Sequence, residues 1–161
     1  MENIEIKKVS LQDTKFLFEL MNNPLVLARL NEVPTTENDW VNAVLAWEKD
    51  PDENGYIIWK DGKRVGWFAF NGLLSADRIP WLKMAVILPE YHNQGIGTLV
   101  LTKLLKGIQE KGFHSVKLLT NQDNLKAQKC YQNCGFQIIA VIEDEMSDGT
   151  RAMRCTMECK I

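Results

Sequence analysis

Residues 81–105, which read WLKMAVILPEYHNQGIGTLVLTKLL, decide the fold. The apolar run from Trp81 to Leu88 predicts a buried strand that ends at Pro89. A polar loop then leads into Gly95-Ile96-Gly97, and apolar residues at helical spacing follow as far as Ile108. The segment therefore predicts a strand, a glycine turn and an amphipathic helix.

A glycine turn before a helix has two interpretations. The first N–H groups of a helix have no partner within the helix, and the helix dipole makes that end partly positive. Glycine lets the backbone approach a bulky anion closely. The turn could therefore hold a phosphate or pyrophosphate. Alternatively, it is a tight connection that binds nothing, because short glycine motifs are weakly specific.

Composition indicates one globular domain over residues 1–161. The chain is 45% hydrophobic and 25% charged, which is typical of folded proteins. A net charge of −2 gives no bulk attraction to nucleic acid or to a membrane, and we expect neither as a partner. Residues 81–135 carry seven Lys against three acidic residues, whereas the rest carries twelve basic and eighteen acidic residues. This asymmetry suggests a basic site for an anionic ligand beside an acidic face.

The four cysteines form two C-x3-C pairs, Cys130 with Cys134 and Cys155 with Cys159. A zinc site would place such pairs in loops, but here they fall in an expected helix and an expected strand. We expect reduced thiols and no metal. The chain shows neither a cationic and apolar leader nor an apolar run of membrane-spanning length, so a soluble, cytoplasmic protein is expected.

The rest of the chain alternates strand and helix patterns. In chain order we expect strand 3–9, a helix through 16–21 capped by Ser10 or Asp13 and ending before Asn22-Asn23-Pro24, a connector over 25–30, and a helix through 40–47 capped by Thr36 with Asp39. Strands 55–59 and 64–70 follow around an Asp61-Gly62 turn. After the segment described above we expect strand 115–120, a helix from Asn124 to Gly135, and a hairpin of 136–145 with 150–159. The order β-α-α-β-β-β-α-β-α-β-β predicts an α/β (α+β) fold with a single mixed sheet.

A second informative segment runs from Asn124 to Phe136. Asn124 can cap its helix or bind an amide-bearing ligand, and Lys126 and Lys129 are neighbours on the helix surface. Tyr131 lies about two turns further on, on roughly the same side as Asn124. Taken singly, these residues are also explained by a cap, solvated lysines and a core tyrosine.

Together the two segments resemble the GNAT superfamily of acyl-CoA-dependent N-acetyltransferases. The family motif Q/R-x-x-G-x-G/A corresponds to His92-Asn93-Gln94-Gly95-Ile96-Gly97, after Ile87-Leu88-Pro89, and only its first position differs. The pattern N-x-x-A-x-x-x-Y-x-x-x-G-F is complete as Asn124, Ala127, Tyr131, Gly135 and Phe136. The order of elements also fits the family fold, whose sheet is mostly antiparallel.

The resemblance implies acetyl-CoA as cosubstrate, with no metal. A bulged strand that splays from its neighbour would offer a backbone N–H to the thioester carbonyl, at Ile87 or its neighbour Leu88. Tyr131 would be the general acid for the departing thiolate. The other residues expected to bind the cofactor are His92, Asn93, Gln94, Gly95, Ile96, Gly97 and Thr98 around the pyrophosphate, Asn124 at the next helix, and Lys126 and Lys129 near the 3′-phosphate.

One residue, His92, departs from the family pattern, and the identity of the general base stays open. His92 stands where the family has Gln or Arg, which removes a permanent charge and could make affinity depend on pH. The general base has no motif: Glu143, Asp144, Glu145 and Glu32 are candidates, and each also fits a surface charge.

The N-terminal third resembles the branch that contains ribosomal-protein N-terminal and spermidine acetyltransferases. Residues 32–53 hold seven acids and one Lys, and Glu143-Asp144-Glu145 adds a second acidic cluster. We therefore expect a cationic acceptor, such as a small-molecule amine or a peptide N-terminus. Alternatives are a non-catalytic acyl-CoA sensor and a dinucleotide-binding enzyme, although Val100 occupies the third glycine position of G-x-G-x-x-G. The family often dimerises, so a homodimer is left open.

Overall fold

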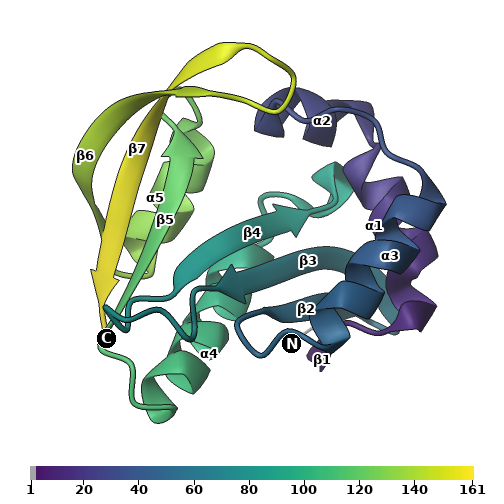
Figure 1. The fold of residues 1–161 in the computed structure, drawn as a ribbon, viewed down its shortest axis with the longest axis horizontal. Coiled ribbons are helices and arrows are strands. Elements are labelled where there is room, and N and C mark those ends of the chain that lie inside the picture. Colours follow the sequence, from purple (N-terminus) through teal and green to yellow (C-terminus); the bar gives the residue numbers. More distant parts are fainter. Residues whose placement is uncertain (1–2) are drawn as a thin grey trace.

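A computed structural model describes residues 3–161, which form one seven-stranded sheet with helices on both faces (Figure 1). In chain order the elements are β1 (Ile4–Lys8), η1 (Leu11–Asp13), α1 (Thr14–Met21), α2 (Pro24–Leu30), α3 (Glu37–Glu48), β2 (Asn54–Lys60), β3 (Lys63–Asn71), β4 (Trp81–Ile87), η2 (Pro89–Tyr91), α4 (Ile96–Glu110), β5 (Ser115–Asn121), α5 (Leu125–Asn133), β6 (Phe136–Glu145) and β7 (Arg151–Lys160).

The sheet runs β1-β2-β3-β4-β5-β7-β6, and its pairs are antiparallel except β4 with β5. The expected mixed, mostly antiparallel sheet is thus confirmed. The turn between β2 and β3 places Asp61 and Gly62 at φ of 50° and 79°. Two successive left-handed residues match the twist of a two-residue hairpin, as the Asp-Gly pair predicted.

Two hydrophobic cores fill the two faces of the sheet. One core packs α4 against Phe70, Leu118 and Met157, all of which are almost completely buried. The other packs α1 and α3 against Ile57 and Trp67. Because β3 contributes to both cores, its apolar run is buried on both sides, and it lies centrally between β2 and β4.

A bulge and a splay open the sheet at β4. Phe70 pairs with Leu82 while Ala69 pairs with Met84, so Lys83 is the extra residue of a β-bulge. Beyond the bulge, β4 and β5 separate, because they pair only at Trp81 with Lys117 and at Leu82 with Leu118. The expected bulged and splayed strand is therefore present, directly before the glycine turn.

The segment 24–30 is a helix, which corrects the expected connector. Asn23 accepts hydrogen bonds from the N–H groups of Leu25 and Val26 at 3.0 and 3.4 Å, and Pro24 occupies the first helical turn. Asn22-Asn23-Pro24 was interpreted only as the end of a helix. The same residues are also a start signal, since Asn caps well and Pro fits the first turn.

Within residues 3–161, no helix combines the length and apolarity needed to cross a membrane. The same residues contain no group of three or more His, Cys, Asp or Glu that could hold a metal ion. All four cysteines are free thiols.

Candidate active site

A pocket of about 350 Å³ lies at the splay between β4 and β5. It gathers residues from α2, the end of β4, the glycine turn and α5, which are far apart in the sequence. The residues predicted for the site that line it are Ile87, His92, Asn93, Gln94, Gly95, Ile96, Gly97, Thr98, Asn124, Lys126, Lys129 and Tyr131. Leu88 is the one predicted residue outside this lining.

The glycine turn leaves the start of α4 open to a ligand. Gly95 is the N-cap in the left-handed region at φ 76°, and it offers no side chain to bond the N–H groups of the first turn. A Cβ on Gly95 would meet nothing within 4 Å, so the approach is unobstructed. Unpartnered N–H groups at a helix start fit a pyrophosphate.

Gly97 has a different role. A Cβ at Gly97 would lie 3.4 Å from Cys130 Sγ, so the missing side chain also makes room for α5. The Thr98 hydroxyl lies 3.5 Å from the same sulfur. The two segments predicted from sequence are therefore in direct contact here.

The end of β4 presents one backbone N–H to the pocket. The Leu88 N–H donates to Val65 O at 2.8 Å, so it points toward β3 and is occupied. Because N–H groups alternate in direction along a strand, the Ile87 N–H points the other way, toward the gap left by β5. Of the two expected donors, Ile87 has the geometry to polarise a carbonyl placed in that gap.

His92 connects the end of β4 to α2. Its Nε2–H donates to Ile87 O at 2.8 Å, and its Nδ1 lies 3.0 Å from the Arg29 guanidinium, which fits the neutral imidazole as acceptor. Burial lowers the pKa of His92, and the charges of Arg29 and Lys126 lower it further, against the hydrogen bond to Ile87. His92 therefore acts as a neutral bridge.

Tyr131 reaches the pocket from the second turn of α5. Its ring packs edge-on against Phe136, with centroids 6.0 Å apart. Burial raises the pKa of the Tyr131 phenol, so the hydroxyl keeps its proton at neutral pH. A protonated phenol in the pocket can donate to a leaving group.

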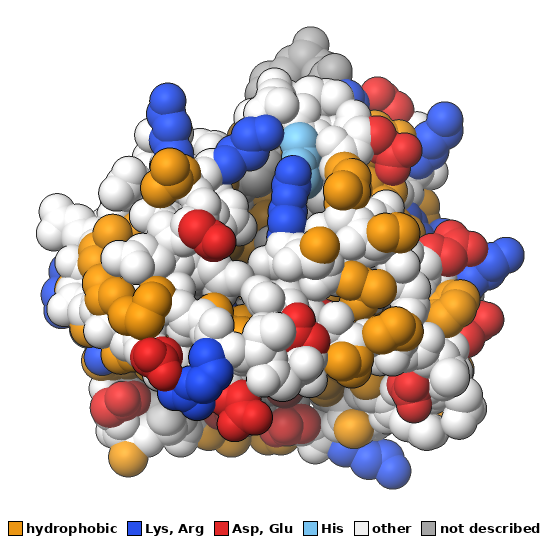
Figure 2. All heavy atoms as spheres, turned by 90° about the horizontal axis from the view of Figure 1, so that it is seen from above, with side chains coloured by type: hydrophobic (Ala, Val, Ile, Leu, Met, Phe, Trp, Pro, Cys, Tyr) orange, Lys and Arg blue, Asp and Glu red, His pale blue; other side chains and the backbone are white. Residues whose placement is uncertain are grey.

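The residues at the start of α5 combine a structural and a binding position. The Asn124 side chain accepts from the Ala127 N–H at 3.3 Å, so it caps the helix as well as lining the pocket. Lys126 and Lys129 line the same side. Seen from above, Lys and Arg side chains lie beside a His side chain in the upper middle of the molecule, between two flanks richer in hydrophobic side chains and above several acidic side chains (Figure 2). This charge suits an anionic ligand.

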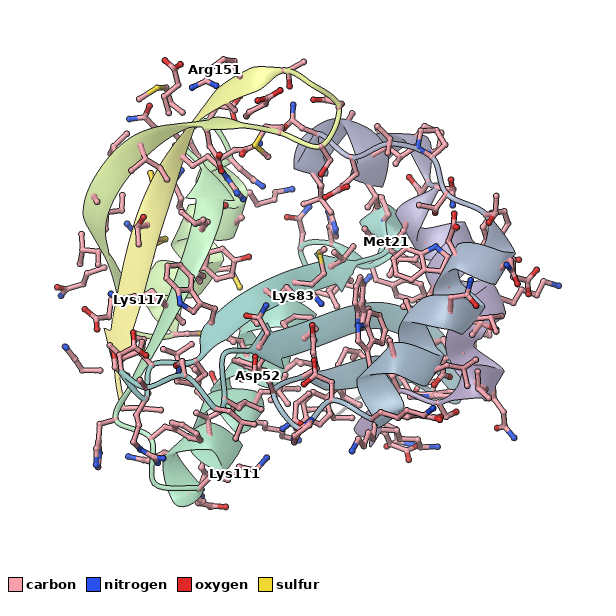
Figure 3. All side chains as sticks on the ribbon, in the orientation of Figure 1. Met21, Asp52, Lys83, Lys111, Lys117 and Arg151 are labelled. Atoms are coloured by element: carbon pink, nitrogen blue, oxygen red, sulfur yellow. The ribbon has the colours of Figure 1, made fainter. Side chains whose placement is uncertain are left out.

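Several acids of the two clusters that led us to expect a cationic acceptor form ion pairs within the chain. Glu143 pairs with Arg151 at 2.7 Å, and Asp144 with Arg154 at 3.5 Å. Glu53 pairs with Lys83 at 2.5 Å. Figure 3 labels Lys83 near the middle of the sheet face between α3 and the last hairpin. These carboxylates are therefore less available to a cationic acceptor than the sequence suggested.

The family comparison agrees with this fold and pocket. The model of the acetyltransferase (GNAT) family matches residues 16–136, about three quarters of the chain. The protein belongs to this family.

Individual relatives are more distant. An uncharacterized N-acetyltransferase of Mycobacterium bovis is 32% identical over 94 residues, covering 58% of this chain and 53% of that protein. Another, of Methanocaldococcus jannaschii, is 24% identical over 109 residues, covering 65% of this chain and 48% of that protein. The chain thus spans about half the length of the curated relatives it matches.

Among solved structures, spermidine N-acetyltransferase from Vibrio cholerae, in complex with CoA and spermine, superposes with a TM-score of 0.88. The two chains are 18% identical, and the match covers 98% of this chain and 95% of the other. At this identity the likeness establishes the fold.

Arg29 and Cys130 are among the lining residues that the sequence analysis did not assign to the site. Arg29 belongs to α2, which was expected to be a connector, so nothing indicated that it would reach His92. Cys130 follows Lys129 on α5 and lines the pocket beside Gly97. Its position one turn after Ala127 was a usable signal, since residues three and four apart share a helix face.

Proposed function

We propose that this protein transfers an acetyl group from acetyl-CoA to the primary amine of a small molecule or of a peptide N-terminus. The observation that supports this most directly is the pocket itself, which brings the open start of α4 and the protonated Tyr131 to the two sides of the β4–β5 gap. Bound acetyl-CoA supplies an activated thioester.

The residues of the pocket bind the cofactor, stabilise the developing negative charge and donate the proton. The first N–H groups of α4 hold the pyrophosphate, with Lys126 and Lys129 toward the 3′-phosphate. The Ile87 N–H stabilises the negative charge that develops on the carbonyl oxygen as the amine nitrogen attacks. Tyr131 gives its proton to sulfur as the carbon–sulfur bond breaks, and the proton lost by the amine passes to solvent.

Replacing Tyr131 tests the proton-donor role. We expect Tyr131→Phe to lower kcat by about tenfold or more, because general acids contribute ~10²–10⁴-fold, while acetyl-CoA affinity stays unchanged. Thiol release against a panel of amines, polyamines and peptides gives kcat, and calorimetry gives affinity. Wild-type turnover in the variant would remove Tyr131 from this role.

Thiol release, together with thermal unfolding in the presence of CoA or NAD, separates the two alternatives. A non-catalytic acyl-CoA sensor binds acetyl-CoA and transfers acetyl to no amine. A dinucleotide-binding enzyme is stabilised by NAD. The proposal instead expects stabilisation by CoA, about 2.7 kcal/mol at a hundredfold excess over Kd, and none by NAD.

The proposal also covers the domain organisation, compartment, acceptor and oligomeric state of the protein. Residues 1–161 act as one domain, because a single sheet runs through the described chain. A reducing, cytoplasmic compartment is supported by four unpaired thiols. The spermine complex of the Vibrio cholerae relative supports a small-molecule amine as acceptor. A homodimer is supported by β6, an edge strand with exposed apolar side chains.

A further inference from the structure

A second pocket, of about 380 Å³, lies mostly on the sheet face opposite α4 and α5, although its lining includes Leu82 of the core under α4. Its lining residues are Asn71, Trp81, Leu82, Lys83, Leu119 and Arg154. Phe70, Leu118 and Cys155 belong to the core under α4. Because side chains alternate across a strand, their neighbours Asn71, Leu119 and Arg154 point to the other face.

The lining of this second pocket contains cations and no acidic residue, although each cation has a carboxylate partner outside the lining. Two of its six lining residues, Lys83 and Arg154, are cations, and none of the six is acidic. Lys83 has a close partner in Glu53, at 2.5 Å. Asn71 adds an amide, and Trp81 adds an apolar wall. The lining therefore favours an anionic or zwitterionic group over a polycation.

Arg154 is incompletely bonded within this lining. Its Nη1 lies 3.5 Å from an Asp144 carboxylate oxygen, and its Nη2 donates weakly to Leu119 O at 3.4 Å. Its Nε is buried and has no hydrogen-bond partner in the described part of the chain. Leaving a buried donor unpaired costs about 1–3 kcal/mol. The Nε and Nη2 groups form the planar fork that a carboxylate binds with both oxygens.

Arg154 also lies close enough to Tyr131 to affect the pKa of its phenol. Burial, the larger effect, raises the pKa of the Tyr131 phenol, and the positive charge of Arg154 acts to lower it. Tyr131 reaches the sheet from the α5 side, whereas Arg154 lies on the other face. The charge of Arg154 therefore acts on Tyr131 across the sheet, next to the strands β4 and β5 that separate beyond Leu82.

We propose that the Nε and Nη2 groups of Arg154 bind a carboxylate of the acceptor, so that the acceptor is an amine that also carries a carboxylate, such as an amino acid or a short acidic peptide. This inference rests on the proposed function and specifies its substrate class. Lys83 and Asn71 line the same pocket and would assist Arg154 in binding the carboxylate. With its carboxylate held there, the acceptor would extend its amine toward the β4–β5 gap beside Tyr131.

The test compares matched acceptors. Acetyl-transfer kinetics are measured with amino acids and with their carboxamides, which differ only in the charged group, and with polyamines. For the wild type we expect kcat/KM to be about tenfold or more higher for the carboxylates, the size of one charge-assisted hydrogen bond. Arg154→Gln should raise KM for the carboxylates by about the same factor and leave the carboxamide KM nearly unchanged, and any change in kcat through Tyr131 should be equal for the two acceptor types.

Arg151→Gln is the matched control. Arg151 lies on the same strand, but its guanidinium is exposed and pairs with Glu143 outside the pocket. This variant should keep the wild-type preference. Calorimetry with CoA and thermal unfolding confirm that both variants are folded.

Three outcomes overturn the inference: equal or better acetylation of carboxamides or polyamines, an Arg154→Gln effect of the same size on both acceptor types, and the same loss in Arg151→Gln. If CoA binds but no acceptor of the panel is acetylated, thermal shifts with CoA and each acceptor decide, since only carboxylates should stabilise the wild type and not Arg154→Gln. Failure of the proposed function is different, because it appears as absent CoA binding or as absent thiol release with every amine.

Discussion

His92, the residue that departs from the family motif, has a defined structural task. It donates to Ile87 O and accepts from Arg29, so it needs one protonated and one unprotonated ring nitrogen. A permanently charged arginine could not accept the second bond. His92 therefore links α2 to the end of β4 through its two hydrogen bonds, in addition to any direct effect on pyrophosphate binding.

The state of His92 predicts a pH dependence. Its pKa is lowered in the folded protein by burial and by two nearby cations, so the unfolded chain takes up a proton more readily. The stabilisation by neutral His92 is present above the unfolded pKa of about 6.5 and is lost as the pH falls below it. Urea unfolding at pH 7.5 and 5.5 should show a smaller decrease for His92→Gln than for the wild type. Equal decreases would contradict the prediction.

Cys130 is predicted to be a reactive thiol. The neighbouring Cys134 thiol lowers the pKa of Cys130 to about 6, the Thr98 hydroxyl lowers it further, and burial acts in the opposite direction. Iodoacetamide should label Cys130 with a half-maximal rate near that pH, and CoA should slow the reaction because Cys130 lines the pocket. Mass spectrometry identifies the site.

The buried Cys155 and Cys159 are internal controls for this labelling and should react far more slowly. Cys134→Ala removes the thiol donor and should move the midpoint upward. A midpoint near 8.5, the value of an ordinary thiol, would show that Cys130 is not activated.

At the scale of elements, short sequence patterns correctly predicted the features that depend on neighbouring residues alone, such as helix caps and hairpin turns. The Thr36 and Asp39 capping box forms both of its hydrogen bonds, at 3.2 and 2.8 Å. The Asp61-Gly62 turn joins the strands as its residue types require. The helix α2 was missed because Asn23-Pro24 suits either a helix end or a helix start. Packing decides between the two, since Val26 is buried against the core of α1 and α3.

Gly66 is predicted to position the end of β4. A Cβ there would lie 2.6 Å from both Val86 O and Ile87 Cδ1, so the backbone of β4 would have to move. We expect Gly66→Ala to reduce the free energy of unfolding by about 1–3 kcal/mol, as overpacking does, and to weaken acetyl-CoA binding. Urea unfolding and calorimetry measure the two effects.

Gly107 provides the matched control on α4. A Cβ there would meet nothing within 4 Å. Gly107→Ala should therefore stabilise the protein by about 0.5–1 kcal/mol through helix propensity. If both alanine variants were equally stable, close approach at Gly66 would not be what positions β4.

At the scale of the whole molecule, the sequence indicated one side of the candidate site. The glycine turn and α5 carry recognisable spacing, and twelve predicted residues line one pocket. Arg29 and Arg154 carry no such signal, because only tertiary packing brings α2 and β7 to the gap. The acidic run likewise could not be interpreted from charge alone, since its partners, such as Lys83 for Glu53, lie far away in the sequence.

The edge strand β6 has the features of a dimer interface. It pairs only with β7, which leaves its outer backbone groups free for another strand. Exposed apolar side chains lie along the hairpin: Ile138, Ile139, Val141, Ile142 and Met153, each at least 40% exposed. Two copies of β6 can pair antiparallel across a two-fold axis, which buries the same patch twice. We therefore expect a dimer in solution.

A charge on this edge should separate the copies, because a lysine on an edge strand opposes pairing. Val141→Lys should change the mass measured by light scattering from that of a dimer to that of a monomer. Leu74→Lys places the same charge on another exposed leucine, 67% exposed in the loop before β4, and should leave the dimer intact. A monomeric wild type, or a dimer that persists in Val141→Lys, would show that β6 is not the interface.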